Sequence, residues 1–406
     1  VTTVKTSTFT AVAGEGYFIN TTGGAVTVNL PAGTAGAVVA VKDYAGTFDT
    51  NAVTLVQNGS DKIGGSTVNA TLDVEGIAVT LVFIDSTQGW LVTDSGLQDE
   101  APTAQYITAT GGNTVANDGN FKVHTFTSPG TFTVCSVGNA AGSNTVSYMV
   151  VAGGGGAGGD SGGAGGAGGF REGKTPQCTY TQSPIACTSG SNNGLPVTAT
   201  GYPITIGAGG SAGTGAPPPG TPTSGSDGNP SSFAGSSTIT STGGGGGGSR
   251  PSPNGRPGGS GGGARSQAGS AGSGNTPPVS PAQGFDGAGA TPTPGGNSGG
   301  GGGATALGVY APSCSAGGPG GAGATTSING TPTAFAGGGG GGGSSSPGNV
   351  GGTGGAGGGG NGAQGSAPAT GNAGTANTGG GGGGGGDDAT GGAGGSGIVI
   401  IRYKFQ

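Results

Sequence analysis

Charged side chains are scarce in this chain of 406 residues. Only 7% of the residues are charged, and the formal net charge is −6. Nucleic-acid binding depends on clustered lysine and arginine, and these side chains are few and scattered here, so we expect no nucleic-acid partner. Intrinsic disorder usually combines low hydrophobicity with high charge. This chain lacks the charge, so its composition does not by itself predict disorder.

Long apolar runs are missing as well. No stretch of about 20 apolar residues occurs, so we expect no membrane insertion. The first ten residues, VTTVKTSTFT, do not have the composition of a signal peptide. Helical periodicity is absent throughout, and the sequence therefore predicts essentially no α-helix.

Cysteine is rare, and the four cysteines match no zinc-site spacing. Cys178 and Cys187 flank one proline-containing loop, which a disulfide could close. Four free thiols are an equally open alternative. We expect no metal site.

Residues suited to catalysis are equally few. The single histidine, His124, lies in an expected strand, where a packed or surface role is favoured, and no paired carboxylates suggest glycosidic chemistry. Asp387 and Asp388 follow a glycine run and are interpreted as a solvated turn rather than a cation site. The sequence does not support an enzyme.

One motif resembles a nucleotide site. Residues 168–175 (GGFREGKT) fit the phosphate-loop pattern, which requires a strand before the loop and a helix after it. Here a glycine run precedes the motif, and a proline at position 176 argues against a helix. We therefore expect no cofactor.

Glycine is the abundant residue. The chain has 109 glycines, including the uninterrupted runs 243–248, 299–303, 337–343 and 379–386. Fixing each residue costs about 1–2 kcal/mol of backbone entropy, and glycine has no side chain to bury in return. Such runs form either a disordered linker or a bundle of polyglycine-II helices, which have three residues per turn and point their N–H and C=O groups outward.

The flanking segments favour the bundle. Residues 1–96 show short apolar runs separated by turn residues, which predicts an all-β sandwich or barrel. Residues 97–120 are polar and are expected to be a linker. Entry strands are expected within 121–151 and a closing strand at 397–406, so residues 152–396 would be a polyglycine-II bundle with loops, held between strands that pair in one sheet.

Loops between the glycine runs carry most of the aromatic and cationic side chains of this region. Such side chains on a rigid scaffold are typical of binding surfaces. Phe233 and Phe335, which occupy similar positions before glycine runs, are interpreted as structural plugs. The candidate receptor-binding residues are Tyr180, Tyr202, Arg250, Arg256, Phe285 and Tyr310.

Three motifs support a family resemblance: the entry VHTFTSPGTFTV at 123–134, the junction YMVVAGGGG at 148–156 and the exit GSGIVIIRY at 395–403. Together they resemble the glycine-rich domain of bacteriophage tail-fibre and virion proteins. Residues 1–96, which end in the motif GWLV at 89–92, resemble β-modules of phage structural proteins more loosely.

The resemblance implies a virion fibre or tip protein that is extracellular when it acts. In related long-tail-fibre adhesins, a glycine-rich tip of layered polyglycine-II helices binds the host surface through its loops. The implied partners are a host receptor, either protein or glycan, and other virion proteins contacted through the N-terminal module, which is expected to form a homotrimer. Two alternatives stay open: a capsid or tail decoration fibre without a specific receptor, and an ice-binding or matrix protein.

Overall fold

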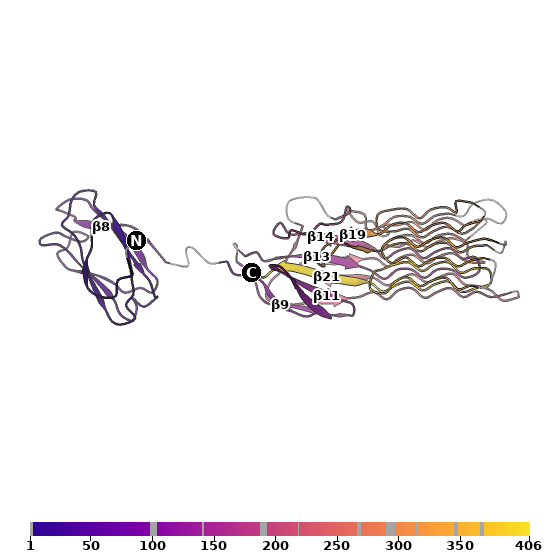
Figure 1. The fold of residues 1–406 in the computed structure, drawn as a ribbon, viewed down its shortest axis with the longest axis horizontal. Coiled ribbons are helices and arrows are strands. Elements are labelled where there is room, and N and C mark those ends of the chain that lie inside the picture. Colours follow the sequence, from indigo (N-terminus) through magenta and orange to yellow (C-terminus); the bar gives the residue numbers. More distant parts are fainter. Residues whose placement is uncertain are drawn as a thin grey trace. The chain divides into compact units, whose positions relative to one another are not determined.

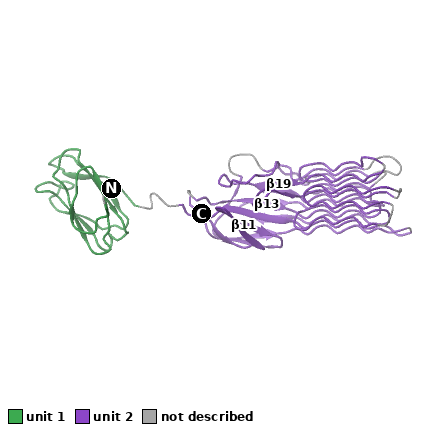
Figure 2. Cartoon of the chain, viewed as in Figure 1, with its two compact units in different colours: residues 1–103 green, residues 104–406 purple. Residues whose placement is uncertain are grey.

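A computed structural model of the chain describes residues 3–97, 104–139, 142–186, 193–217, 219–265, 269–289, 297–313, 315–344, 348–365 and 369–406. The chain divides into two compact units, Val1–Thr103 and Ala104–Gln406 (Figure 2). The described residues contain strands, turns and extended segments but no helix. The all-β prediction is therefore confirmed.

Unit 1 packs two four-stranded sheets around one apolar core. The sheet orders are β1-β3-β5-β6 and β2-β4-β7-β8. Alternate residues of each strand face inward, as in β7, where Val79, Leu81 and Phe83 are buried, and Trp90 is completely buried beside them. The strands are β1 (Phe9–Thr10), β2 (Glu15–Ile19), β3 (Val26–Asn29), β4 (Val38–Asp43), β5 (Val53–Val56), β6 (Ala70–Leu72), β7 (Ala78–Phe83) and β8 (Trp90–Gly96).

Unit 2 begins with two larger sheets and continues into the glycine region (Figure 1). One sheet has the order β10-β11-β21-β13-β14, with β15 also paired to β13, and the other has the order β18-β17-β16-β12-β9; β19 and β20 form a separate hairpin. The strands are β9 (Thr108–Thr110), β10 (Thr114–Asp118), β11 (Phe121–Phe126), β12 (Gly130–Ser136), β13 (Thr145–Val151), β14 (Phe170–Gly173), β15 (Leu195–Pro196), β16 (Gly201–Thr205), β17 (Ser231–Ala234), β18 (Thr238–Ser241), β19 (Ala324–Thr326), β20 (Thr333–Phe335) and β21 (Ile398–Lys404).

The expected bracket of strands is present. β21 at the C-terminal end pairs antiparallel with both β11 and β13. Apolar clusters cover both faces of this sheet, one containing Val150 and Ile401 and the other containing Met149 and Ile400. Burial on both faces explains the continuous apolar run at 398–401.

The interpretation of residues 97–120 as a linker is wrong for its second half. Residues 108–110 form β9, which pairs with β12, and residues 114–118 form β10, which pairs with β11. Both are edge strands with largely exposed side chains. Their polar composition therefore resembles that of a linker, although their backbones are paired.

The glycine region is a lattice of extended segments joined by backbone hydrogen bonds, and residues 153–160 lie at its centre. Successive amides of this segment donate to three neighbours in turn, and every third residue returns to the same neighbour. The accepting segments are 223–229, 389–395 and 163–166, and the segments that donate back are 210–213, 244–247 and 382–385. Six neighbours and a period of three are the geometry of packed polyglycine-II helices.

Glycine is needed in this lattice because the backbones approach too closely for a side chain. A Cβ added at Gly154 would lie 2.1 Å from the carbonyl oxygen of Gly380, and one added at Gly339 would lie 2.0 Å from that of Gly382. A methyl group is accommodated only at particular positions, such as the fully buried Ala157.

Candidate recognition surfaces

Side chains on the perimeter of the lattice follow the same period of three. In the outer segment 205–214, the exposed residues are Thr205, Ala208, Ser211 and Thr214, and the intervening backbone faces inward or is partly covered. A helix with three residues per turn places every third side chain on one face. The perimeter can therefore present a regular row of side chains, whereas the described interior consists mainly of glycine backbone with a few small side chains.

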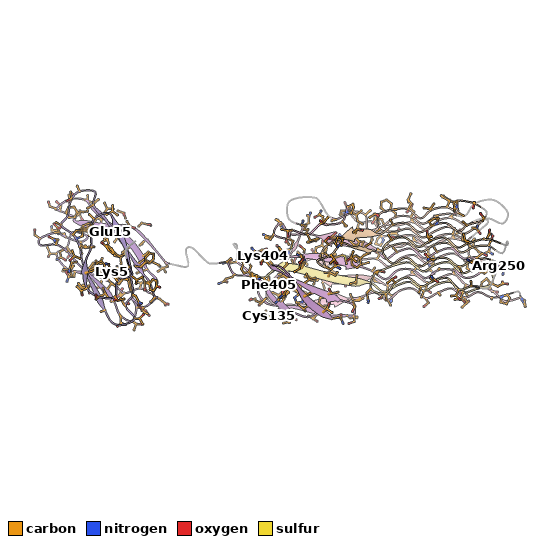
Figure 3. All side chains as sticks on the ribbon, in the orientation of Figure 1. Lys5, Glu15, Cys135, Arg250, Lys404 and Phe405 are labelled. Carbon is orange, nitrogen blue, oxygen red and sulfur yellow. The ribbon has the colours of Figure 1, made fainter. Side chains whose placement is uncertain are left out.

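A charged cluster lies at the distal end of the lattice, the end away from the sheets, where Figure 3 shows Arg250. Asp160 is 2% exposed, and its Oδ2 accepts Arg250 Nε at 3.2 Å and an Nη of Arg265 at 3.3 Å. Arg265 Nε also donates to the backbone oxygen of Asp160 at 3.0 Å. One buried carboxylate thus binds two arginines that follow it by 90 and 105 positions in the chain.

Asp387 and Asp388 belong to the same cluster. Burial raises the pKa of the Asp387 carboxyl above its usual value, and the carboxylates of Asp388 and Asp160 raise it further, while Arg265 and Arg250 oppose this shift. The turn predicted at these residues is present, and Asp388 has a positive φ of 48°. Among the described residues, no group of three or more His, Cys, Asp or Glu side chains could hold a metal ion.

An apolar flank, defined by Phe285, Leu307, Val309, Tyr310 and Val350, occupies one side of the lattice. These are the large apolar side chains that are exposed in the described part of the glycine region. Their segments are adjacent: Gly308 N donates to Asp286 O, Val309 N to Pro319 O, and Gly317 N to Val350 O. The five side chains therefore lie on neighbouring segments of the lattice.

Four of the six candidate residues have half-exposed or exposed side chains. Arg250 lies in the distal charged cluster. Tyr310 lies on the apolar flank, and Phe285 is 36% exposed on the same flank. Arg256 donates to Asp227 Oδ2 at 2.8 Å, and the other oxygen of that carboxylate accepts the amide of Gly246. The Arg256 side chain therefore also has a structural partner.

The other two candidates, Tyr180 and Tyr202, are each 6% exposed. Tyr202 lies in β16 within the core between the two sheets, and its hydroxyl bonds to Thr198. Tyr180 packs on the opposite face of the central sheet, below the guanidinium of Arg402. Neither side chain can reach a partner in this conformation. Phe233 and Phe335 are likewise buried in these clusters.

The residues of the phosphate-loop pattern serve the fold. Residues 170–173 form β14, and Glu172 is 3% exposed, with its carboxylate accepting Ser183 N at 2.8 Å and Thr326 Oγ1 at 2.6 Å. Lys174 Nζ donates to the carbonyl oxygen of Tyr180 at 2.7 Å. These contacts fasten the following loop to the sheet.

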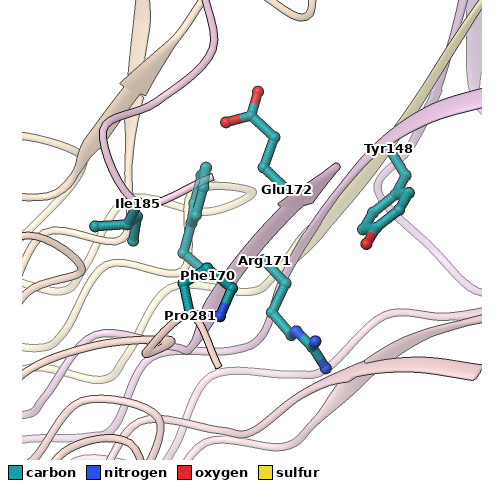
Figure 4. Close-up of a pocket in the computed structure, with 6 residues that line it drawn as sticks. All are labelled: Tyr148, Phe170, Arg171, Glu172, Ile185 and Pro281. Atoms are coloured by element: carbon teal, nitrogen blue, oxygen red, sulfur yellow. The ribbon is translucent and has the colours of Figure 1, made fainter. Parts of the chain in front are cut away.

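A cavity of about 40 Å³ beside this strand is lined by Tyr148, Phe170, Arg171, Glu172, Ile185 and Pro281 (Figure 4). A cavity of about 150 Å³ holds benzene, so this one is too small for an organic ligand of that size.

His124 is completely buried in β11. Its Nδ1 donates to Gly111 O at 2.6 Å, and its Nε2 accepts the hydroxyl of Tyr403 at 3.1 Å. Burial lowers the pKa of the ring below its usual value, and Lys122 acts in the same direction, while the bond to Gly111 opposes them. The neutral ring is a packed core residue.

Two further observations concern cysteine and hydrophobicity. Cys178 is buried, and Cys187 lies outside the described residues, so the disulfide between them stays a prediction. The described residues form no helix that is long and apolar enough to cross a membrane.

Sequence reasoning missed two features. Asp160 pairs with Arg250 and Arg265, which lie about 90 to 105 positions away in the chain. No local sequence pattern predicts these ion pairs. The outer face of the β2-β4-β7-β8 sheet was also missed, although alternation in these strands could have indicated it. Phe18 is 40% exposed there, beside an apolar hollow of about 170 Å³.

Comparisons with known proteins define the class of both units. The family model of the N-terminal part of bacteriophage T4 gp9/10-like proteins matches residues 1–98. The baseplate wedge protein gp10 of Enterobacteria phage T4 is 40% identical over 79 residues, which are 19% of this chain and 13% of that relative. These matches support a bacteriophage virion protein of baseplate or tail type and point to a structural role.

The second unit gives the family. The model of the glycine-rich domain matches residues 125–404, which is more than half of the chain. The chain belongs to this glycine-rich domain family, with a T4 gp9/10-like region before the domain.

Proposed function

We propose that this virion protein recognises a receptor on the host cell surface through the glycine-rich domain. The observation that carries the proposal is the distribution of side chains: in the described part of the lattice, the interior is mainly glycine backbone, and the large functional groups that are exposed lie on its perimeter and in its turns. Such a scaffold holds its surface rigidly, because every layer is fixed by hydrogen bonds to its neighbours. Rigid scaffolds with variable turns are common recognition devices.

Two surfaces are available for recognition: the distal cluster and the apolar flank. Arg250 keeps 47% of its side chain exposed while Asp160 fixes its Nε. A held arginine loses little freedom on binding, which favours affinity. Tyr310 and Phe285 supply aromatic contact area, and aromatic and arginine side chains dominate the energy of many interfaces.

Unit 1 is proposed to attach the protein to other virion proteins and to form a homotrimer. The support is the outer face of its β2-β4-β7-β8 sheet, where Phe18 and Val38 are exposed beside small residues such as Gly16 and Ala40. An apolar sheet face of this kind can be covered by another protein. Sedimentation of a fragment of residues 1–100 at micromolar concentration should show a trimer; a monomer would remove that part of the proposal.

The adsorption of purified protein to host cells tests receptor recognition. Replacing the distal turn 250–253 by a Gly/Ser sequence should reduce adsorption and keep the melting temperature within a few degrees. The matched control replaces Thr331 and Pro332, in the exposed turn between β19 and β20, by a Gly/Ser pair. That control should adsorb like the unchanged protein.

A purely structural role is the competing reading, and the relative that is named a baseplate wedge protein favours it. The two readings predict different results. If exchanges of every described distal turn and of the exposed flank residues leave adsorption intact, or if the unchanged protein does not adsorb at all, the structural role replaces recognition.

A further inference from the structure

Tyr310 lies against the backbone of a neighbouring segment. A Cβ built on Gly289 would be 3.2 Å from Tyr310 Cε1 and 3.5 Å from its hydroxyl oxygen. Gly289 is buried, while the tyrosine side chain stays 58% exposed. The aromatic ring therefore covers the glycine and leaves much of its own surface open to a ligand.

The glycine at position 289 serves the ring rather than the lattice. A Cβ on Gly287, two residues earlier in the same segment, would meet Gly262 O at 2.2 Å. At Gly289, the nearest backbone atom to such a Cβ is Gly269 O at 3.6 Å, an ordinary contact. The hydrogen-bonded backbone would thus accept alanine here, and the atoms in its way belong to Tyr310. The absence of a side chain at Gly289 therefore makes room for the Tyr310 ring.

The surroundings of the ring combine apolar area with unpaired backbone groups. Leu307 precedes Tyr310 by one turn of three residues and is 55% exposed, and Val309 is 47% exposed. The amides of Leu307 and Tyr310 have no hydrogen-bond partner among the described residues. The carboxylate of Asp286, on the adjacent segment, already accepts the amide of Gly274 at 2.7 Å. The platform therefore offers an aromatic surface, two backbone donors and one exposed carboxylate.

We propose that this platform binds an uncharged sugar ring of a host-surface polysaccharide. A pyranose has an apolar C–H face that stacks on an aromatic ring and hydroxyl groups at its edge that need hydrogen-bond partners; the platform supplies both. The exposed carboxylate of Asp286 would repel an anionic ligand, and it can accept hydrogen bonds from the hydroxyl groups of a neutral sugar. The inference rests on the proposed receptor recognition and names the class of receptor.

Two probes separate the inference from the proposed function. One is polysaccharide released from the host envelope by mild acid and treated with protease. The other is the envelope protein fraction freed of that polysaccharide. The full chain is used throughout, and its adsorption to whole cells is measured in parallel.

The variants isolate the ring. Tyr310→Ala should weaken polysaccharide binding about tenfold, which corresponds to one lost aromatic contact. Tyr310→Phe should bind like the unchanged chain, and Gly289→Ala, which displaces the ring by a few tenths of an ångström, should bind severalfold more weakly. Tyr44→Ala is the matched control, since Tyr44 is also 58% exposed but belongs to unit 1. It should have no effect.

Each outcome decides the inference. Binding to the polysaccharide that depends on Tyr310 supports it. Polysaccharide binding that is absent, or equal in Tyr310→Ala, overturns it. Adsorption to cells together with binding only to the protein fraction overturns the sugar assignment and leaves receptor recognition standing. Tyr310-dependent polysaccharide binding without adsorption to cells would count against receptor recognition alone.

Discussion

Replacing Gly382 by alanine should destabilise the glycine lattice cooperatively. The added Cβ would lie 2.1 Å from Gly392 O, where an ordinary contact is at least 3.4 Å. The two segments must therefore move apart by more than 1 Å. Such a shift breaks the hydrogen bond from Gly392 N to Gly383 O, now 2.8 Å, and strains the bond from Ala157 N to Gly392 O, now 2.9 Å.

The size of the effect follows from the number of bonds affected. Each backbone hydrogen bond contributes about 0.5–1.5 kcal/mol net. With three or four bonds lost between the segments, the free energy of unfolding of unit 2 should fall by about 2–5 kcal/mol. A Gly382→Val change should unfold the lattice outright, because the larger side chain displaces more than one neighbour.

Denaturant unfolding separates this effect from general damage. The chain has one tryptophan, Trp90, which is buried in unit 1, so its fluorescence reports unit 1 alone. Amide hydrogen exchange of peptides from residues 153–169 reports the lattice. The tryptophan transition should not change, whereas exchange of the lattice amides should accelerate.

The matched control is Gly289→Ala, a lattice glycine whose Cβ would meet no backbone atom closer than 3.6 Å. It should change the stability of unit 2 by less than about 1 kcal/mol. If Gly382→Ala is as mild as this control, close backbone packing does not determine the stability of the domain.

Three further predictions concern single side chains of unit 2. Burial lowers the pKa of His124 in the folded state, so the unfolded chain takes up a proton more readily than the folded chain. The stability of unit 2 should therefore decline as the pH falls below about 6.5. Urea midpoints measured from pH 7.5 to 5 would show this slope, and a His124→Asn variant that keeps the whole slope would contradict it. Asp160→Asn removes the charge shared by two arginines and should cost about 1–3 kcal/mol in thermal unfolding, more than the same change at the more exposed Asp227; equal losses would show that burial is unimportant. Lys174→Ala should cost about 1 kcal/mol through the lost bond to Tyr180 O and should change no nucleotide affinity in calorimetry, whereas micromolar ATP binding that disappears in the variant would restore the phosphate-loop reading.

The sequence predicted the elements with strong local patterns. The alternating apolar and polar residues of β11 and the apolar run of β21 predicted strands. The glycine runs indicated backbone packing, because they have no side chains that could stabilise a fold. Polar edge strands were not predictable in this way. β9 and β10 are held by their neighbours and carry few apolar residues, so their composition matched that of a linker.

The candidate surfaces were harder to predict than the fold. Tyr180 and Tyr202 stand in stretches that look like loops, but those stretches fold back onto the sheets and bury both rings. Arg250 and Tyr310 are exposed because their segments turn or run at the edge of the lattice. Which segment reaches an edge depends on contacts between distant parts of the chain, and local sequence does not encode them.

The outward-facing side chains of segments such as 205–214 limit the width of the lattice. A face of bare glycine backbone could receive another extended chain, just as an open strand edge recruits a further strand. Thr205, Ala208, Ser211 and Thr214 stand where that next chain would lie. These side chains therefore act as terminators of lateral growth, and the width of the domain is set by where the glycine pattern is interrupted. By the same logic, a pair of segments could be gained or lost at the edge without redesigning the interior, so that one scaffold could acquire new turns while keeping its old packing.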